Sequence, residues 1–396
     1  MSQSVSYNPP RFEPVQELFP ATTVLQLAWS WAVVIAFQIG EHSWFVQPIS
    51  TPVAIVSFVV LFATILLAAF DVVREADHLA DKLGEPYGTL ILTLSIVSIE
   101  VILISSVMMG PGDSSTIGRD SIFAVMMIIL NLVTGLCLLL GGWRYGEQEY
   151  NSQGAVAYLS MIVLLTGTAL VLPNVVSSGD GSFLPSQAVA ISALTIILYA
   201  TFLALQMRGY RRFFIQPQVG FLSISVQPAS EAVPDAGGSN PTELDKRSIL
   251  IRSTILLALI LPIVLLAHDL AILIDLGIEH AGAPVAVGGV LIAIIVFTPE
   301  SITAVKAALA NQMQRAINLC LGAFVSTVGL TVPAVLVIGL TTGKTVTLGL
   351  NDLDTVLMVI TVAISTLSFL GLRTSPVQGV IHLTVFAMYG VLLFMP

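Results

Sequence analysis

The chain has 396 residues, of which 56% are hydrophobic and only 10% are charged, and its formal net charge is −9. Its mean hydropathy is +0.93, whereas a soluble domain typically has about 25% charged residues. This composition excludes a soluble globular protein and predicts an all-α polytopic membrane protein. It offers no basic patch for nucleic acid, and its two cysteines lie inside apolar stretches, which argues against a disulfide framework or a zinc site.

A helix that crosses a bilayer needs about 20 apolar residues, and eleven stretches of the chain meet this requirement. The preceding segment, residues 1–21, is polar and lacks the pattern of a cleaved signal peptide, so we expect a cytoplasmic tail there. The predicted spans are residues 22–40, 50–70, 88–109, 121–141, 155–173, 186–206, 250–274, 284–309, 316–340, 354–371 and 376–395.

One long polar segment, residues 207–249, divides the spans into two groups. It is rich in Pro, Gly, Ser and acids and has too little apolar mass to fold, so we predict a flexible cytoplasmic linker. Residues 22–206 then hold an extra first helix and five spans, and residues 250–396 hold five more. A regulatory role for the acidic part of the linker is the less favoured alternative.

The distribution of Lys and Arg predicts the orientation of the chain. With the linker in the cytoplasm, thirteen of the fifteen Lys and Arg residues fall on the cytoplasmic side, and only Arg119 and Lys344 fall outside. The N-terminus is therefore expected in the cytoplasm and the C-terminus on the external face of a plasma (inner) membrane. The charged segment 71–84 extends the second span, and its acids either gather cations near an entrance or form a solvated helix end.

Two glutamates stand near the middle of apolar spans, Glu100 in the third and Glu300 in the eighth. An ionised acid at this depth costs roughly 2.5–3.5 kcal/mol on insertion scales, so such a residue usually faces a partner or a wet cavity. By span count the third and eighth spans run in opposite directions, and each is the second span of its five-helix group. Two inverted five-helix repeats of this kind place a transport site at the midplane between them.

Hydroxyl groups accompany both acids and would add hard oxygen ligands. Ser95 and Ser98 precede Glu100, and Thr298 and Ser301 flank Glu300. A proline directly before Glu300 also frees the carbonyl of the residue four positions earlier. Carboxylates, hydroxyls and carbonyls together suit Ca²⁺, which accepts many oxygen ligands in irregular geometry.

If Glu100 and Glu300 meet, burial and like charge disfavour the doubly ionised state. A cation that enters the site then displaces protons, and protons displace the cation, so the pair predicts exchange of Ca²⁺ for H⁺. No resident cofactor is expected, and the predicted partners are the lipid bilayer and the transported cations, with the oligomeric state left open. The alternative for each glutamate is a purely structural hydrogen bond.

Further polar residues could line the same cavity or could only bridge helices. In the ninth span they are Asn318, which we include among the supporting ligands, and Ser326, Thr327 and Thr331; in the fourth span there is Asn131. His382 in the last span is interpreted as a core histidine with satisfied hydrogen bonds.

The sequences LGEPYGTLIL at 83–92, PES at 299–301, KAALANQMQRAIN at 306–318 and LTVP at 330–333 resemble a known family. It comprises the bacterial calcium/proton (sodium, potassium/proton) antiporters of the cation/calcium exchanger superfamily. The resemblance covers the chain from about residue 13. It implies ten core helices plus an extra first one, with Glu100 and Glu300 binding cation and proton alternately.

The chain departs from the plant and fungal relatives, which have Gly-Asn three residues before each acid. Those positions hold Ile96-Val97 and Val296-Phe297 here, so two amide ligands are missing. A monovalent Na⁺(K⁺)/H⁺ antiporter is therefore the leading alternative, and a passive cation channel is a further one. An intramembrane enzyme is disfavoured because no His-Glu-x-x-His or Ser/His arrangement occurs at one depth.

Overall fold

The computed structural model describes residues 21–44, 49–83, 87–110, 115–176, 179–207, 209–217 and 243–395. Within these ranges the chain is helical, and its only β contacts are two isolated bridges. The helices are α2 Ala21–Trp44, α3 Thr51–Leu83, α4 Tyr87–Met108, α5 Ile117–Met126, η1 Met127–Val133, α6 Thr134–Tyr145, α7 Ser152–Thr166, η2 Gly167–Val171, η3 Leu172–Asn174, α8 Pro185–Met207, η4 Arg211–Phe214, α9 Glu243–Ala281, α10 Ala286–Leu309, α11 Met313–Thr342, α12 Asp352–Phe369 and α13 Pro376–Phe394.

Ten of the helices in the described ranges are long and apolar enough to cross a membrane. The remaining predicted span, residues 88–109, corresponds to α4, whose 22 residues include a shorter apolar stretch, Thr93–Met108. The predicted all-α polytopic architecture is confirmed. Several helices continue past the apolar segment that the sequence marks: α9 has 39 residues, because its polar ends remain helical beyond the predicted span 250–274.

The helix pairings repeat between the two halves of the chain. Helices α3 to α8 form the first half, with α5, η1 and α6 making one continuous span, and α9 to α13 form the second. The first helices of the halves, α3 and α9, pack together, and so do the second helices, α4 and α10. The third helix of each half packs on the fifth helix of the other, α6 on α13 and α11 on α8. This reciprocity is the arrangement that two inverted five-helix repeats produce.

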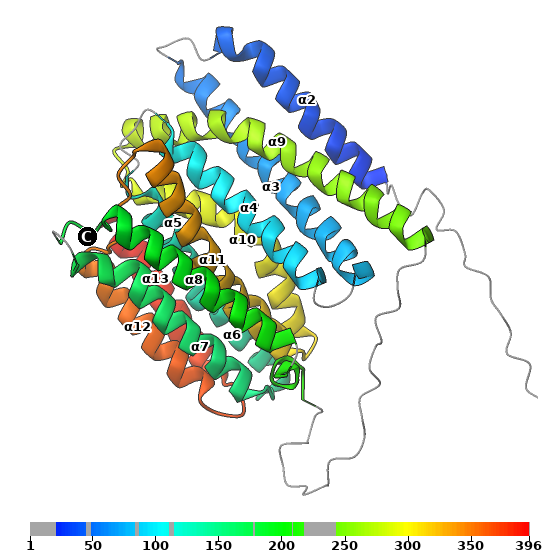
Figure 1. Ribbon diagram of the computed structural model, residues 1–396, viewed down its shortest axis with the longest axis vertical. Helices are drawn as coiled ribbons and strands as arrows, with labels where there is room; N and C mark the ends of the chain where they lie inside the picture. The colour runs from blue at the N-terminus through cyan, green and yellow to red at the C-terminus, as the bar shows by residue number, and fades with distance from the viewer. Residues whose placement is uncertain are drawn as a thin grey trace, which may run out of the picture.

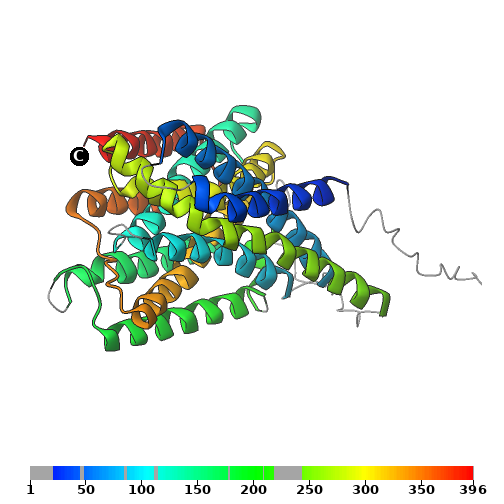
Figure 2. The ribbon, with the colours of Figure 1, turned by 90° about the horizontal axis from the view of Figure 1, so that it is seen from above.

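The extra helix α2 lies outside this pattern. It contacts α3 and α9 and runs along the edge of the bundle (Figures 1 and 2). Two polar contacts hold it to α3: the indole of Trp29 donates to Thr64 over 3.1 Å, and Arg74 donates to Thr23 over 3.0 Å. Helix α2 therefore covers the α3–α9 pair without contributing to the centre of the protein.

Glycine allows α10 to cross α5 closely, and this crossing places the second half's acid helix at the centre. A Cβ added at Gly289 would lie 2.6 Å from the backbone carbon of Asp120 and from the backbone nitrogen of Ser121. Small residues at helix crossings permit such approach in membrane bundles. Helix α10 consequently also packs against α4 and α11.

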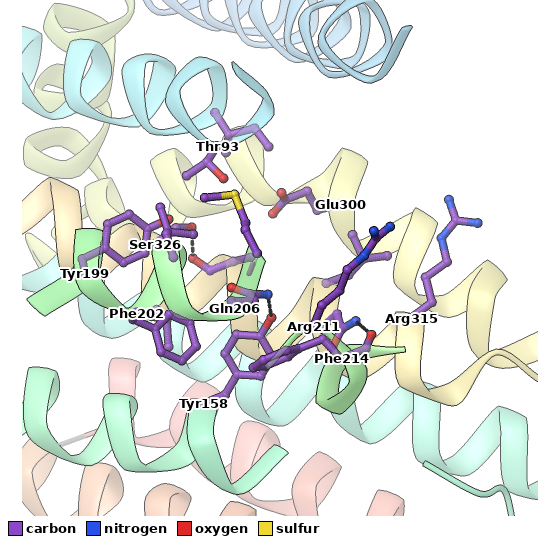
Figure 3. A pocket seen from close by; sticks show the side chains of 18 of the residues that line it. Thr93, Tyr158, Tyr199, Phe202, Gln206, Arg211, Phe214, Glu300, Arg315 and Ser326 are labelled. Carbon is purple, nitrogen blue, oxygen red and sulfur yellow. Dashed lines mark hydrogen bonds between the residues drawn. The ribbon is translucent and has the colours of Figure 1, made fainter. Parts of the chain in front are cut away.

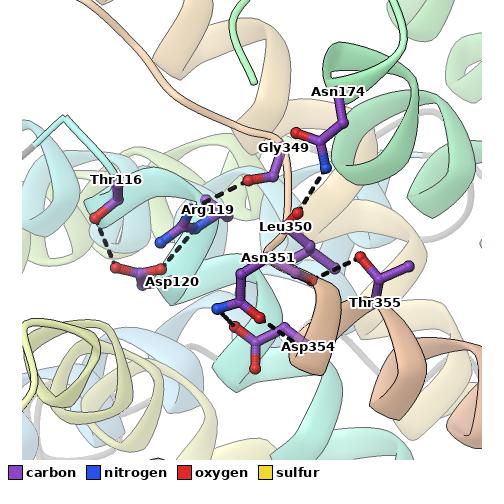
Figure 4. A network of polar contacts seen from close by, with 9 residues as sticks. All are labelled: Thr116, Arg119, Asp120, Asn174, Gly349, Leu350, Asn351, Asp354 and Thr355. Atoms are coloured by element: carbon purple, nitrogen blue, oxygen red, sulfur yellow. Dashed lines mark hydrogen bonds and ion pairs between the residues drawn. The ribbon is translucent and has the colours of Figure 1, made fainter. Parts of the chain in front are cut away.

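A network of polar contacts joins the two halves at the end of the bundle opposite the linker (Figure 4). Arg119 donates to the carbonyl of Gly349 over 3.1 Å, and Asn174 donates to the carbonyl of Leu350 over 2.6 Å. Arg119 also pairs with Asp120 over 2.8 Å. Because both connections run from the first half to the segment before α12, they tie the halves together at this end.

The predicted linker, residues 207–249, has structured ends. On its first-half side, η4 contacts α7, α8 and α11, and on its second-half side α9 begins at Glu243. Residues 218–242 lie outside the described residues, as does the predicted tail apart from Ala21. The boundaries of the two halves stay predictions.

Candidate functional site

The two glutamates lie on helices that pack against each other at the centre of the bundle. Glu100 on α4 is 0% exposed and Glu300 on α10 is 9% exposed. The carboxyl groups are near enough for their charges to interact. The structure therefore brings together the two acids that the sequence places 200 residues apart.

Each carboxyl group has one buried oxygen without a hydrogen-bond partner. Thr331 on α11 donates to Oε2 of Glu100 over 2.9 Å, and the hydroxyl of Thr327 one turn earlier lies on the same side of the helix. Oε1 of Glu100, Oε2 of Glu300 and the hydroxyl of Thr327 are buried and unpartnered. Leaving such groups unsatisfied is unfavourable, so this cluster is suited to hold a proton or a cation.

A cavity of about 340 Å³ leads to Glu300 from the linker end of the bundle. Figure 3 shows the carboxyl group of Glu300 on this cavity, with Thr93, Tyr199 and Ser326 near one end. The other end is lined by Gln206, Arg211, Arg315 and Asn318. Glu100 is not among the described residues that line the cavity, and its side chain is fully buried.

Acids of the segment 71–84 have different surroundings. Glu75 forms a buried ion pair with Arg252 over 3.0 Å, and Asp71 pairs with Arg74 over 2.5 Å. Asp77 is exposed and is close enough to Glu300 for their charges to interact. Both interpretations of this segment, cation gathering and a solvated helix end, stay predictions.

The predicted supporting hydroxyls are mostly engaged with their own helices. Ser98, Thr298 and Ser301 donate to the carbonyls of residues four positions earlier, over 2.5, 2.5 and 2.6 Å. Ser95 is buried on α4. Asn318 lines the cavity, but its amide donates to the carbonyl of Phe214 over 2.7 Å and its oxygen accepts from Gln314. Their role as cation ligands stays a prediction.

A second buried polar network lies between η1, α12 and α13. Asn131 donates to Thr361 over 2.9 Å, and its oxygen is 3.3 Å from Nδ1 of His382, whose Nε2 is 3.1 Å from Ser368. His382 is thus a satisfied core histidine, as predicted. Asn131 bridges helices and is not among the residues found to line the cavity.

Sequence reasoning missed the arginines of the cavity. In the sequence, Arg211 and Arg315 are only two of the many basic residues that indicate the orientation of the chain in the membrane, whereas in the structure both line the cavity. Their position depends on how η4 folds back onto α11, which no local pattern encodes.

Comparison with known proteins identifies relatives that match most of the chain. The profile of the family described as sodium/calcium exchanger protein matches residues 53–208 and 252–395. A protein of Sinorhizobium fredii described as an ionic transporter, y4hA, is 35% identical over 331 residues, which are 83% of this chain and 86% of the relative. The sodium-potassium/proton antiporter ChaA of Escherichia coli is 32% identical over 365 residues, which are 92% of this chain and 94% of the relative.

The fold has solved counterparts as well. The crystal structure of the Ca²⁺/H⁺ antiporter YfkE superimposes with a TM-score of 0.68 at 17% identity and covers 95% of this chain and 100% of that chain. At this level of identity the likeness concerns the fold. The family match over both halves, with the two relatives above 30% identity, shows that the chain belongs to the sodium/calcium exchanger family, within the cation/calcium exchanger superfamily.

Proposed function

We propose that the protein is a secondary transporter that exports Ca²⁺ in exchange for H⁺ by alternating access. Glu100 and Glu300 bind the cation and the protons in turn. The observation that carries this proposal is the pair of buried, unpartnered carboxyl oxygens, one on each acid, in interacting carboxyl groups. A proton on either unpartnered oxygen, or a cation between the two carboxyl groups, supplies the missing partner and so removes the cost of burying that oxygen unsatisfied.

Cation transport is coupled to proton transport because the site holds either the cation or the protons but not both. Two neighbouring carboxylates in a low-dielectric site repel each other, so the empty and doubly ionised site is disfavoured. Two protons or one divalent ion each bring the site to neutrality. The cavity and the opposite network support one-sided access: Glu300 is reached from the linker end, while Arg119 and Asn174 tie the halves at the other end.

The direction of transport follows from orientation. The bias of Lys and Arg places the linker end in the cytoplasm, so the cavity opens toward the cytoplasm of a cell whose plasma (inner) membrane holds the protein. An inwardly directed proton gradient then drives cation export.

A monovalent Na⁺(K⁺)/H⁺ antiporter is the second candidate. It is favoured by the 32% identical relative, a sodium-potassium/proton antiporter, and by the apolar side chains before each acid. Ile96, Val97, Val296 and Phe297 are all at most 5% exposed and supply no oxygen to a cation.

Everted membrane vesicles test the proposal directly. Addition of Ca²⁺ should collapse an imposed proton gradient, and Glu100→Gln and Glu300→Gln should each abolish this response. Glu147→Gln is the matched control, because the side chain of Glu147 is 62% exposed, pairs with Arg373 and is not among the described residues that line the cavity. Normal exchange in either site variant removes that residue from the mechanism, and cation flux without proton flux indicates a channel.

A further inference from the structure

Two arginines line the same cavity as the acid that we propose binds cations. Arg211 comes from η4 and Arg315 from the first turn of α11, and we call them the arginine pair. Figure 3 shows both near Glu300 at the linker end of the cavity. Fixed positive charge repels every cation that uses this route, so the pair needs a physical explanation.

Arg211 is held in place by the anchoring of its short helix. The carbonyl of Phe214 accepts from the amide of Asn318 over 2.7 Å, and the side chain of Gln216 accepts from the backbone of Gln314 over 2.8 Å. The ring of Phe214 stacks edge-on against Tyr158 at 5.1 Å. These contacts attach η4 to α7 and α11, so Arg211 belongs to the wall of the cavity.

The positive charge of the pair is not neutralised locally. In the described part of the chain, the ion pairs involve neither arginine. Arg315 reaches only the amide oxygen of Gln312, over 3.5 Å, and the cavity side chains around them, Gln206 and Asn318, are neutral. The two guanidinium groups therefore contribute a positive potential to the cavity, where Glu300 and the nearby Asp77 are the opposing acids.

We propose that the arginine pair sets the ion selectivity of the site by penalising divalent cations twice as strongly as monovalent ones. This inference rests on the proposed function, because it concerns the same acids. The energy of an ion in a fixed potential is proportional to its charge, so one potential changes the affinity for Ca²⁺ by the square of its effect on Na⁺. The carboxylates attract Ca²⁺, and the arginine pair reduces that preference.

The magnitude is measurable. A unit charge about 10 Å from an ion in a water-filled cavity changes its binding constant by about twofold for a monovalent and about fourfold for a divalent ion. Removing both arginines should therefore lower the dissociation constant of Na⁺ by about fourfold and that of Ca²⁺ by about sixteenfold. Added salt should reduce both effects, because the cavity is open to solvent.

Equilibrium binding of radioactive calcium and radioactive sodium to the purified full-length protein tests this without relying on transport. The variants are Arg211→Gln, Arg315→Gln and the double variant. Arg212→Gln is the matched control, since Arg212 neighbours Arg211 in η4 but lies over the ring of Phe213 at 5.2 Å and is absent from the cavity lining. Arg211→Lys keeps the charge and should keep wild-type affinity for both ions.

The expected result is a change for Ca²⁺ that is the square of the change for Na⁺, with a smaller change for each ion in Arg212→Gln than in Arg211→Gln. Equal changes for the two ions, or no change, overturn the proposal. A wild-type protein that binds these cations but exchanges no protons contradicts the proposed antiport and still decides the role of the arginine pair. Loss of binding in both Glu100→Gln and Glu300→Gln shows that the measured site is the one formed by the two acids.

Discussion

Thr331 donates a hydrogen bond to the carboxyl group of Glu100. The donor and acceptor are 2.9 Å apart, and both residues are 0% exposed. The change Thr331→Val removes the hydroxyl while keeping nearly the same shape, and it takes the donor away from Oε2 of a carboxyl group whose Oε1 already has no partner. The effect should therefore fall on the chemistry of the acid and much less on packing.

A hydrogen bond to a charged group contributes about 1.5–3 kcal/mol, and about 1.4 kcal/mol is a factor of ten in an equilibrium constant. Cation binding needs the ionised acid, and the ionised acid is the form that loses this donor. We expect the half-saturating cation concentration at fixed pH to rise about tenfold to hundredfold. Transport should also need more alkaline conditions, because protons now compete more effectively.

Proton-gradient collapse in everted vesicles, titrated with Ca²⁺ at several pH values, measures this effect. Thr331→Ser retains a hydroxyl and should restore much of the affinity. Thr341→Val is the control on the same helix, since Thr341 is exposed and donates only to its own helix backbone. The reasoning is refuted if Thr331→Val leaves the half-saturating cation concentration unchanged, or if Thr341→Val raises it as much.

Three further predictions concern stability and pH. Gly289→Ala should destabilise the protein by about 1–3 kcal/mol, because its Cβ meets the α5 backbone at 2.6 Å, whereas Gly390→Ala, which has open space, should not; thermal unfolding in detergent compares them. Glu75→Leu alone should cost about 3–5 kcal/mol by leaving Arg252 without its buried ion-pair partner, and Glu75→Leu with Arg252→Leu should recover most of this loss in the same assay. The half-saturating Ca²⁺ concentration of the wild-type protein should fall as pH rises, because fewer protons occupy the acids; a half-saturation independent of pH would contradict competition.

The sequence predicts the parts of the site that depend on one residue in one environment. A lone acid in an apolar span is costly, so Glu100 and Glu300 are visible without any structure. Their spans can be predicted as well, because each is a long apolar stretch of the sequence. The partner of Glu100 is not, because Thr331 looks like any helix-bridging hydroxyl until the crossing of α11 and α4 is known.

Residues of the predicted linker show where prediction from the sequence fails. Composition correctly marks residues 207–249 as poor in apolar mass, but Phe214 and Arg211 act through tertiary contacts with α7 and α11. The hydroxyls of Ser98, Thr298 and Ser301 also look like ligands in sequence, yet a carbonyl one turn earlier is always within reach of a helical hydroxyl. A position close to the acid in the sequence therefore does not show that a hydroxyl is free to bind a cation.

The repeat relationship gives Asn131 a counterpart in the site. Asn131 follows Glu100 by 31 residues, and Thr331 follows Glu300 by the same 31 residues. Both stand on the third helix of their half, and Thr331 of the second half donates to Glu100 of the first. If the proposed alternating access holds, we expect the inverted equivalent of this bond, from Asn131 to Glu300, in the state that faces the other side.

The contacts that Asn131 makes in this structure are compatible with a change of partner to Glu300. It lies in the π-helical segment η1, a local form that often marks functional sites, and it bonds to Thr361 and His382 instead of to an acid. Asn131→Leu should therefore leave cation binding from the linker end near the wild-type level but slow exchange at least several-fold. The comparison of equilibrium binding with vesicle exchange checks this, and thermal unfolding reports any general damage. Unchanged exchange, or loss of binding together with exchange, would show that Asn131 serves the scaffold alone.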